Sequence, residues 1–386
     1  MSIATYPSET TIEPDPITGV PLRRLTDHKG HSHHLYFTNN GWYDRGRRLL
    51  FGSDRFNRTN LYSVEPATGA ISQLTDADMP GPPDETSFIY ACLNPVRDEA
   101  YFWRGRDLIA LDLHRPQERT LYEAPQDFSV TILNCTADGQ YICTSLSQKP
   151  GDQPARMRML RGYVGFRETF LARPLSRVIQ VPTTGGDVQT LHEERAWIGH
   201  VNTSPTQANL LTFCHEGPWH EVEQRIWCLD RATGRVWKVR PQREGEAIGH
   251  EYWMADGLHI GYHGRTAAGP VYGAIGHDNS DAVELPFPHD SHHFHSHDLD
   301  LIVGDGQAGR FPYILLWQRD GEGFTPPRIL CRHRGSAHVQ QTHVHPRLSP
   351  DGRSIVFTSD DLGYGNVYTV DVPADIGQLP LLSERL

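Results

Sequence analysis

Short stretches in which apolar and polar residues alternate recur along the whole chain, separated by turns rich in Gly, Asp and Pro. Alternation with a period of two is typical of β-strands with one buried face, and no long stretch has the 3.6-residue period of an amphipathic helix. The clearest strand pairs follow a polar turn, as in YDRG before RRLLFGSD, TADG before QYICTSL and SPDG before RSIVFTSD. The pattern therefore predicts an all-β protein.

A second recurring element closes each repeat with a turn and one more strand, as in EPATGAISQLTD and DRATGRVWKVRP. Together the two elements make six complete units and a seventh that lacks its last strand. Repeats of roughly 40–50 residues with about four strands each are typical of propeller blades. Residues Val20 to Asp27 (VPLRRLTD) resemble the close of the first unit at Ser72 to Asp76 (SQLTD). We therefore expect a seven-bladed β-propeller whose last blade is closed by this N-terminal strand, since closure removes exposed strand edges.

The repeats predict one domain over residues 1–386, because a β-sandwich or several small domains would not produce seven near-equal units. One unit is overlong, with a basic insertion at about 148–176. The insertion contains Arg156, Arg158, Arg161, Arg167 and Arg173. It is expected to form a short helix or loop over one face, as a plain capping loop or as a basic lid over an anionic substrate.

Composition narrows the classes of partner. The net charge of −11 argues against nucleic acid or an anionic membrane. No apolar run approaches the roughly 20 residues that cross a bilayer, and the polar N-terminus has no secretion signal. The six cysteines show no CxxC spacing, which is typical of reduced thiols in a cytoplasmic protein. No feature of the chain indicates an oligomeric state.

Among the 22 histidines, His343 and His345 are two residues apart in QQTHVHPRLSPDG, before the first strand pair of the last unit. If that stretch is an innermost strand, period-two alternation directs both side chains to one side, toward the centre of the propeller. Two imidazoles that converge on one point can bind a metal ion. Gln340, just upstream, could add an oxygen ligand.

The preceding unit contributes PHDSHHFHSHDLDLIVGDG. Here His293, His295 and His297 alternate on one face, and His292 lies on the other. Spacing alone does not choose between these two sets as further metal ligands.

Two more histidines have acidic neighbours, His215 in TFCHEGPW and His250 in EAIGHEYW. A histidine followed by glutamate near a strand end can be a ligand, a base or a hydrogen-bonded structural residue. Arg225 follows ten residues after His215, on the expected next strand of the same blade.

Taken in order, the motifs FCHEGP, GHEYW, SH…VGDG and QxTHxHPxxxPD resemble those of the oligogalacturonate lyase family, which are seven-bladed propellers. WIGH before FCHEGP and RLTD near the N-terminus extend the resemblance over nearly the whole chain. In that family three histidines and a glutamine bind manganese. By motif, the resemblance places these ligands at His292, Gln340, His343 and His345, with VGDG (303–306) as the anchor for His292.

The resemblance also implies roles for the remaining residues. It places the catalytic base at His250, a substrate-contacting arginine at Arg225, and substrate-side histidines at His200 and His215. The alternating His293, His295 and His297 segment departs from the family pattern, which leaves the local substrate pocket open.

The implied reaction is β-elimination on a small anionic oligosaccharide. A proton leaves C5 of a uronate and the glycosidic oxygen leaves C4. A divalent cation bound to the uronate carboxylate offsets the charge that develops there, and neutral ligands leave the cation its full charge. A neutral histidine suits the base near pH 7. The alternatives are a lyase or hydrolase on a different uronate oligosaccharide, and a sugar-binding propeller without turnover.

Overall fold

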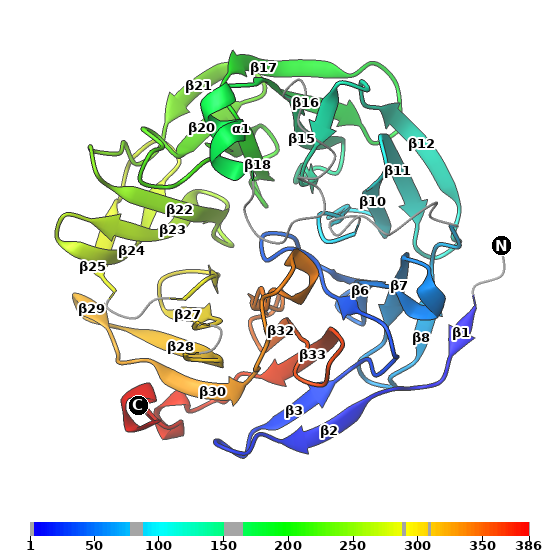
Figure 1. Cartoon of the computed structure of the whole chain (residues 1–386), viewed down its shortest axis with the longest axis vertical. Coiled ribbons are helices and arrows are strands. Elements are labelled where there is room, and N and C mark those ends of the chain that lie inside the picture. The colour runs from blue at the N-terminus through cyan, green and yellow to red at the C-terminus, as the bar shows by residue number, and fades with distance from the viewer. Residues whose placement is uncertain (1–3, 78–87, 150–164, 288–290, 308–309, 386) are drawn as a thin grey trace. The chain divides into compact units, whose positions relative to one another are not determined.

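The computed structural model describes residues 4–77, 88–149, 165–287, 291–307 and 310–385. Their strands form seven antiparallel sheets of four to six strands, in which sequence neighbours mostly pair with one another. This is the seven-bladed β-propeller that the alternation predicts (Figure 1). Residue contacts divide the chain into two compact units. We name them the terminal unit (Met1–Ile89, Leu113–Gln117 and His289–Leu386) and the middle unit (Tyr90–Asp112 and Glu118–Pro288).

The terminal unit contains three of the sheets. The first has strands β1 (Thr5–Tyr6), β4 (Ser32–His33), β5 (Trp42–Tyr43), β6 (Arg48–Ser53), β7 (Asn60–Val64) and β8 (Ile71–Gln73). The second has β2 (Thr11–Pro14), β3 (Pro21–Arg24), β31 (Arg347–Leu348), β32 (Ser354–Ser359) and β33 (Asn366–Asp371). The third has β26 (Phe294–Ser296), β27 (Leu301–Gly304), β28 (Tyr313–Asp320), β29 (Gly323–Phe324) and β30 (Arg328–Arg332). Short 3-10 turns lie at η1 (Arg55–Asn57), η3 (Gln340–Thr342), η4 (Ile376–Gln378) and η5 (Leu382–Arg385).

The middle unit contains the other four sheets. The first has β9 (Cys92–Leu93), β10 (Glu99–Arg104), β11 (Asp107–Asp112) and β12 (Glu118–Glu123). The second has β13 (Phe128–Val130), β14 (Asn134–Cys135), β15 (Tyr141–Gln148), β16 (Leu175–Pro182) and β17 (Gln189–Arg195). The third has β18 (Ile198–Thr203), β19 (Leu210–His215), β20 (Ile226–Asp230) and β21 (Arg235–Lys238). The fourth has β22 (Ala247–Trp253), β23 (His259–Thr266), β24 (Gly269–Gly276) and β25 (Val283–Pro286).

The N-terminal strand closes the last blade as predicted. Strand β3 pairs antiparallel with β33, with Leu22 opposite Val370 and Arg24 opposite Tyr368. Strand β2 then pairs with β3 and adds one further strand outside it. The first and last segments of the chain are therefore held in one sheet by backbone hydrogen bonds.

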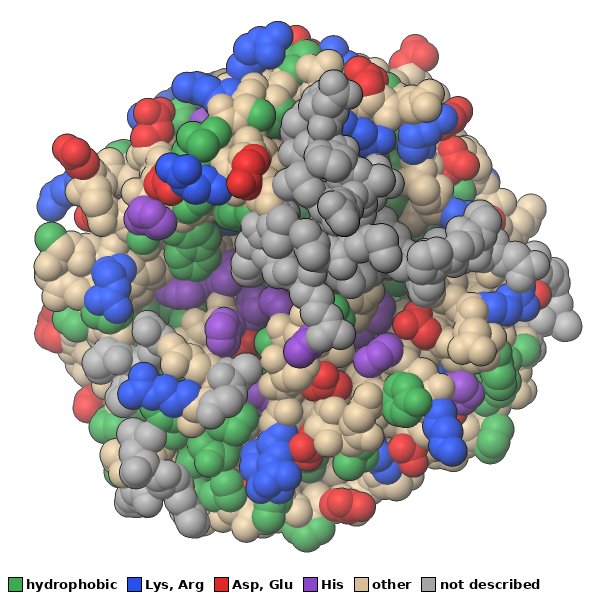
Figure 2. All heavy atoms as spheres, viewed as in Figure 1, with side chains coloured by type: hydrophobic (Ala, Val, Ile, Leu, Met, Phe, Trp, Pro, Cys, Tyr) green, Lys and Arg blue, Asp and Glu red, His purple; other side chains and the backbone are tan. Residues whose placement is uncertain are grey.

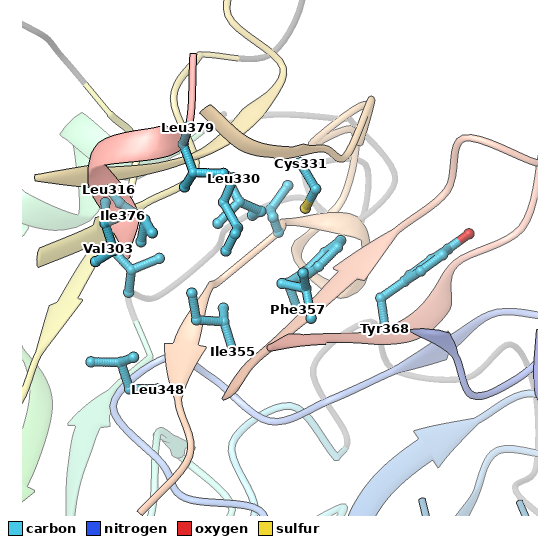
Figure 3. Close-up of a cluster of buried hydrophobic side chains, with 13 residues drawn as sticks. Val303, Leu316, Leu330, Cys331, Leu348, Ile355, Phe357, Tyr368, Ile376 and Leu379 are labelled. Carbon is cyan, nitrogen blue, oxygen red and sulfur yellow. The ribbon is translucent and has the colours of Figure 1, made fainter. Parts of the chain in front are cut away.

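A buried apolar cluster packs the second sheet of the terminal unit against the third (Figure 3). Ile355 and Phe357, two residues apart on β32, direct their side chains into it, and Leu316 and Leu330 enter from β28 and β30. Burying side chains of this size contributes roughly 1.5–3 kcal/mol each. Val344 belongs to the same cluster and is 3% exposed, so the core anchors the chain between His343 and His345.

The insertion contains one described helix, α1 (Phe166–Ala172). Its Arg167 forms an ion pair with Glu221, with Nε 2.8 Å from Oε1. The predicted basic residues Arg156, Arg158 and Arg161 lie outside the described residues, so the basic lid stays a prediction, as does the single domain over 1–386. None of the helices within the described ranges has the length and apolar character needed to span a bilayer.

Candidate active site

Three histidines of the terminal unit, His293, His343 and His345, bring one ring nitrogen each to a common point. These nitrogens all lie within 4.8 Å of one another. The ring centroids are 4.3 Å apart for His293 and His345, 5.4 Å for His343 and His345, and 5.5 Å for His293 and His343. Converging neutral imidazoles are a ligand set for a divalent metal ion. We name these three residues the histidine triad.

The chain reaches this arrangement without the strand that the sequence predicts. His343 and His345 lie in the extended segment between η3 and β31, and the strand begins only at Arg347. His345 has a left-handed backbone, with φ of 46°. A left-handed histidine is uncommon and its strain is typical of functional positions, so a local bend replaces strand alternation as the cause of convergence.

Asp305 orients His293 from behind. Its Oδ2 lies 2.8 Å from Nδ1 of His293, and its Oδ1 accepts hydrogen bonds of 2.8 Å from the backbone N–H of His293 and the hydroxyl of Ser291. Burial alone would raise the pKa of the Asp305 carboxyl, but the adjoining His293 outweighs it and holds that pKa far below its usual range. A carboxylate on one ring nitrogen directs the other nitrogen to a metal, so the VGDG motif supplies a support for the triad.

Aromatic side chains from the N-terminal part of the terminal unit pack against the triad. The Tyr36 ring centroid lies 4.8 Å from that of His345, and the Phe37 centroid lies 5.4 Å from that of His293. Sequence reasoning missed this HSHHLYF segment, although its density of histidine and aromatic residues was a usable signal.

Burial is the main cause that lowers the pKa of His343 to about 4. The imidazole is therefore neutral near pH 7, as a metal ligand must be.

The residues present fit a divalent cation. The buried atoms His343 Nδ1 and Gln340 Oε1 have no hydrogen-bond partner among the described residues. Gln340 is the first residue of η3, and its backbone carbonyl accepts a hydrogen bond from the backbone N–H of His343 at 3.2 Å. The structure thus brings His343 and His345 together and keeps Gln340 in the same turn.

The third imidazole is that of His293, whereas the motif match places this ligand at His292. The His292 side chain is exposed and lies outside the triad. Of the alternating histidines His293, His295 and His297, only His293 belongs to the triad. His295 Nδ1 accepts the backbone N–H of Leu348 at 3.4 Å.

The middle unit contains a second group of candidate functional side chains on neighbouring strands. His200 on β18 and His250 on β22 end the same tripeptide, Ile-Gly-His, and each lies at a break in the pairing register. The strands lie side by side, since Trp253 Nε1 donates to the Asn202 carbonyl at 2.8 Å. Bulges redirect side chains, and His250 has a left-handed backbone with φ of 49°.

His250 is hydrogen-bonded to another histidine. Its Nδ1 lies 3.1 Å from Nε2 of His263 on β23. The Trp219 ring meets both edge-on, with centroids 4.8 Å from His250 and 5.4 Å from His263. Sequence reasoning missed Trp219 and His263, because neither belongs to a spacing that predicts chemistry.

Arg225 is buried between two glutamates. It is 1% exposed, its Nη1 lies 2.6 Å from Glu216 Oε1, and its Nε lies 3.2 Å from Glu251 Oε2. Burial alone would raise the pKa of the Glu216 carboxyl, but the Arg225 guanidinium outweighs it and lowers that pKa. His200 Nε2 lies 3.9 Å from the same carboxylate. These charged groups are arranged around Arg225, which stays a proposed substrate contact.

His215 has a different setting. Its Nε2 lies 2.9 Å from Glu194 Oε1, and its ring packs against Trp227 with a centroid separation of 5.0 Å. These contacts give His215 a structural partner, whereas the resemblance implies a substrate-side role.

Histidine side chains are visible at the surface of the face shown in Figure 2, among acidic and basic side chains.

A family model described as oligogalacturonate lyase matches residues 7–312. The chain belongs to the oligogalacturonate lyase family. This confirms the predicted family and the predicted class of enzyme, a lyase acting on oligosaccharides.

Relatives of the family match over almost the full chain. An oligogalacturonide lyase of Pectobacterium atrosepticum is 27% identical, over 94% of this chain and 96% of the relative. An oligogalacturonate lyase of Dickeya dadantii is 28% identical with the same coverage. A solved oligogalacturonate lyase in complex with manganese is 25% identical with a TM-score of 0.86, covering 97% of this chain and 99% of that one. The expectation of manganese agrees with this last relative.

A Vibrio parahaemolyticus oligogalacturonate lyase, 24% identical with a TM-score of 0.84 over 96% of this chain and 98% of that one, shares the fold. An oligogalacturonide substrate is implied by family membership. The cytoplasmic location and the exclusion of nucleic acid and membranes as partners stay predictions.

Proposed function

We propose that the chain cleaves short oligogalacturonides, saturated or unsaturated, by metal-assisted β-elimination and releases a deoxy-keto uronate monomer. The observation that carries this is the convergence of three imidazole nitrogens within 4.8 Å. The proposed metal ligands are His293, His343, His345 and Gln340, and the proposed ion is manganese.

The donor set supports a cation that acts on a carboxylate. Imidazole and amide ligands are uncharged, so a bound divalent ion keeps its full charge and, as a Lewis acid, offsets the negative charge that develops on the uronate carboxylate. The chain's own contribution is to hold the ligand nitrogens in place, through the Asp305 hydrogen bond and the packing of Tyr36 and Phe37.

The base in this proposal is His250. Its Nε2 takes the C5 proton, the C5–H electron pair forms the C4–C5 double bond, and the C4–O bond breaks. The leaving glycosidic oxygen takes up a proton from water. Histidine suits this step because its neutral form dominates near pH 7. His200 and Arg225 are the proposed contacts of a substrate carboxylate, since guanidinium and imidazole both donate hydrogen bonds to anions.

The test is the ultraviolet absorbance of the new C4–C5 double bond, measured on digalacturonate with and without added manganese after chelation. We expect absorbance to rise only with the metal, before the unsaturated monouronate opens its ring to the isomeric deoxy-keto form. Mass spectrometry should show a monouronate that is one water lighter than galacturonate. Uronate oligomers of other sugars serve as the comparison. Faster turnover of one of these would move the assignment to the different-uronate alternative, and bound metal without turnover of any would leave a sugar-binding propeller.

A further inference from the structure

We infer that His263 is a positioning residue for the base: its Nε2 accepts a hydrogen bond from the Nδ1–H of His250 and so leaves Nε2 of His250 as the basic atom. This inference rests on the proposed function, since it deepens the role of His250. The observation that carries it is the 3.1 Å separation of His250 Nδ1 and His263 Nε2.

The local backbone is built to make this contact. In the ladder between β22 and β23, Gly249 lies opposite His263, and Tyr252 lies opposite Gly261. Residues directly opposite share a face, so in a regular ladder the next residue, His250, would point to the other face. The bulge inserts an extra residue here, and the left-handed φ of 49° at His250 turns its ring toward His263.

Trp219 holds the pair in place. A Cβ atom at Gly249 would lie 2.4 Å from the Trp219 ring, so only glycine leaves room for the indole at this point. The indole edge meets both imidazoles, at 4.8 Å for His250 and 5.4 Å for His263. A side chain that contacts both rings limits their rotation and keeps the two nitrogens aligned.

Only one proton can lie between the two nitrogens while both rings are neutral. If His263 donates it, His250 carries its own proton on Nε2 and has no lone pair for the substrate. If His250 donates it, Nε2 keeps the lone pair that accepts the C5 proton. When that proton arrives, His250 becomes an imidazolium and its Nδ1–H bond to His263 becomes charge-assisted and stronger. The contact therefore stabilises the transition state more than the ground state.

The first test compares His263→Leu with His263→Gln. Leucine removes the acceptor, so we expect kcat to fall about 10- to 100-fold with little change in KM, the range expected for losing a hydrogen bond to a charged group. The acidic limb of the pH–rate profile should move to lower pH, because the imidazolium of His250 loses a stabilising partner. Glutamine can accept the same proton and should recover part of kcat.

The matched control is His259→Gln. His259 belongs to the same strand, β23, and pairs with Asp256 at the surface, where its side chain is 31% exposed. We expect this variant to keep the kcat and the pH profile of the parent protein. Unchanged kcat and pH profile in His263→Leu, or equal losses in the leucine and glutamine variants, would overturn the inference.

A second measurement does not depend on turnover. Long-range ¹H–¹⁵N spectra report which ring nitrogen of a histidine bears the proton, and the His250 signals are assigned by their absence in His250→Gln. We expect the Nδ1–H form in the parent protein and a change toward Nε2–H in His263→Leu. An Nε2–H form in the parent protein contradicts the inference. A protein with the Nδ1–H form but no activity on any uronate would instead contradict the proposed function alone.

Discussion

The two units use histidine in opposite ways. In the terminal unit, His293, His343 and His345 gather three lone pairs on one point. In the middle unit, His250 and His263 bond to each other, and Arg225 is paired with two glutamates, Glu216 and Glu251. The first arrangement suits a cation, and the second suits a base beside an anion.

The comparison shows that the partner of the other ring nitrogen decides what a histidine can do. His293 has a carboxylate on Nδ1, which favours Nε2 as a metal ligand. His250 has the His263 imidazole on Nδ1 in place of a carboxylate, so that nitrogen does not face a negative charge. Residue type is the same in both places, so the chemistry follows from second contacts that spacing does not reveal.

The largest expected effect comes from removing the triad. In His293→Ala, bound manganese should be lost and turnover should fall by about 10³-fold or more, since a Lewis acid contributes several kcal/mol to the barrier. His292→Ala is the matched control, because its exposed side chain lies outside the triad. Metal content after dialysis and the double-bond absorbance are measured together. Metal loss in His292→Ala with retention in His293→Ala would restore the motif-based ligand.

The next largest effect is expected from removing the proposed base of the middle unit. His250→Gln should lower kcat by roughly 10²- to 10⁴-fold, the usual contribution of a general base, while the metal content stays that of the parent protein. Loss of the metal in His250→Gln would show instead that His250 is one of the metal ligands. The same metal and absorbance measurements distinguish these outcomes.

Much of the fold could be predicted from the sequence, and the reason is local. Each repeat contains its own strand alternation and turn residues. The likeness of VPLRRLTD to SQLTD was enough to assign β3 to the last blade. In the site, the His343–His345 pair was found from its spacing, although the expected strand is a bend with a left-handed His345.

The rest of the site could not be predicted because it depends on contacts between distant segments. Adjacent residues such as His292 and His293 differ only in which way the backbone turns before β26. The contacts of His293 with Phe37 and of His250 with Trp219 join segments far apart in the chain. A single sequence holds no signal for such pairs.

A smaller effect is expected from the support behind the triad. Asp305→Asn should lower the affinity for manganese about 10- to 100-fold, because the amide no longer holds the His293 ring as a charged acceptor. The control is Asp300→Asn, since Asp300 lies exposed in the turn before β27. Titration with manganese, followed by activity at saturating metal, measures both. An unchanged affinity would show that packing by Tyr36 and Phe37 orients His293 without the carboxylate.

The smallest effect concerns His215, and it decides whether this histidine belongs to the substrate or to the fold. Burial alone would raise the pKa of Glu194, but its hydrogen bonds with His192 and His215 outweigh burial and lower that pKa from 4.5 to about 2. A depressed native pKa adds stability above about pH 4.5, and this stability is lost as the pH falls toward 2.

His215→Gln should therefore lower the free energy of unfolding at pH 7 by on the order of 1 kcal/mol, since the Glu194 side chain is 30% exposed and its interactions are partly screened. The deficit relative to the parent protein should shrink between about pH 4.5 and 2, where Glu194 becomes protonated in both. Glu194→Gln should reproduce the change, and KM should stay the same in both variants. Urea unfolding at several pH values and steady-state kinetics measure these quantities. A KM raised tenfold with unchanged stability would return His215 to the substrate side, and the middle unit would then use four histidines rather than three.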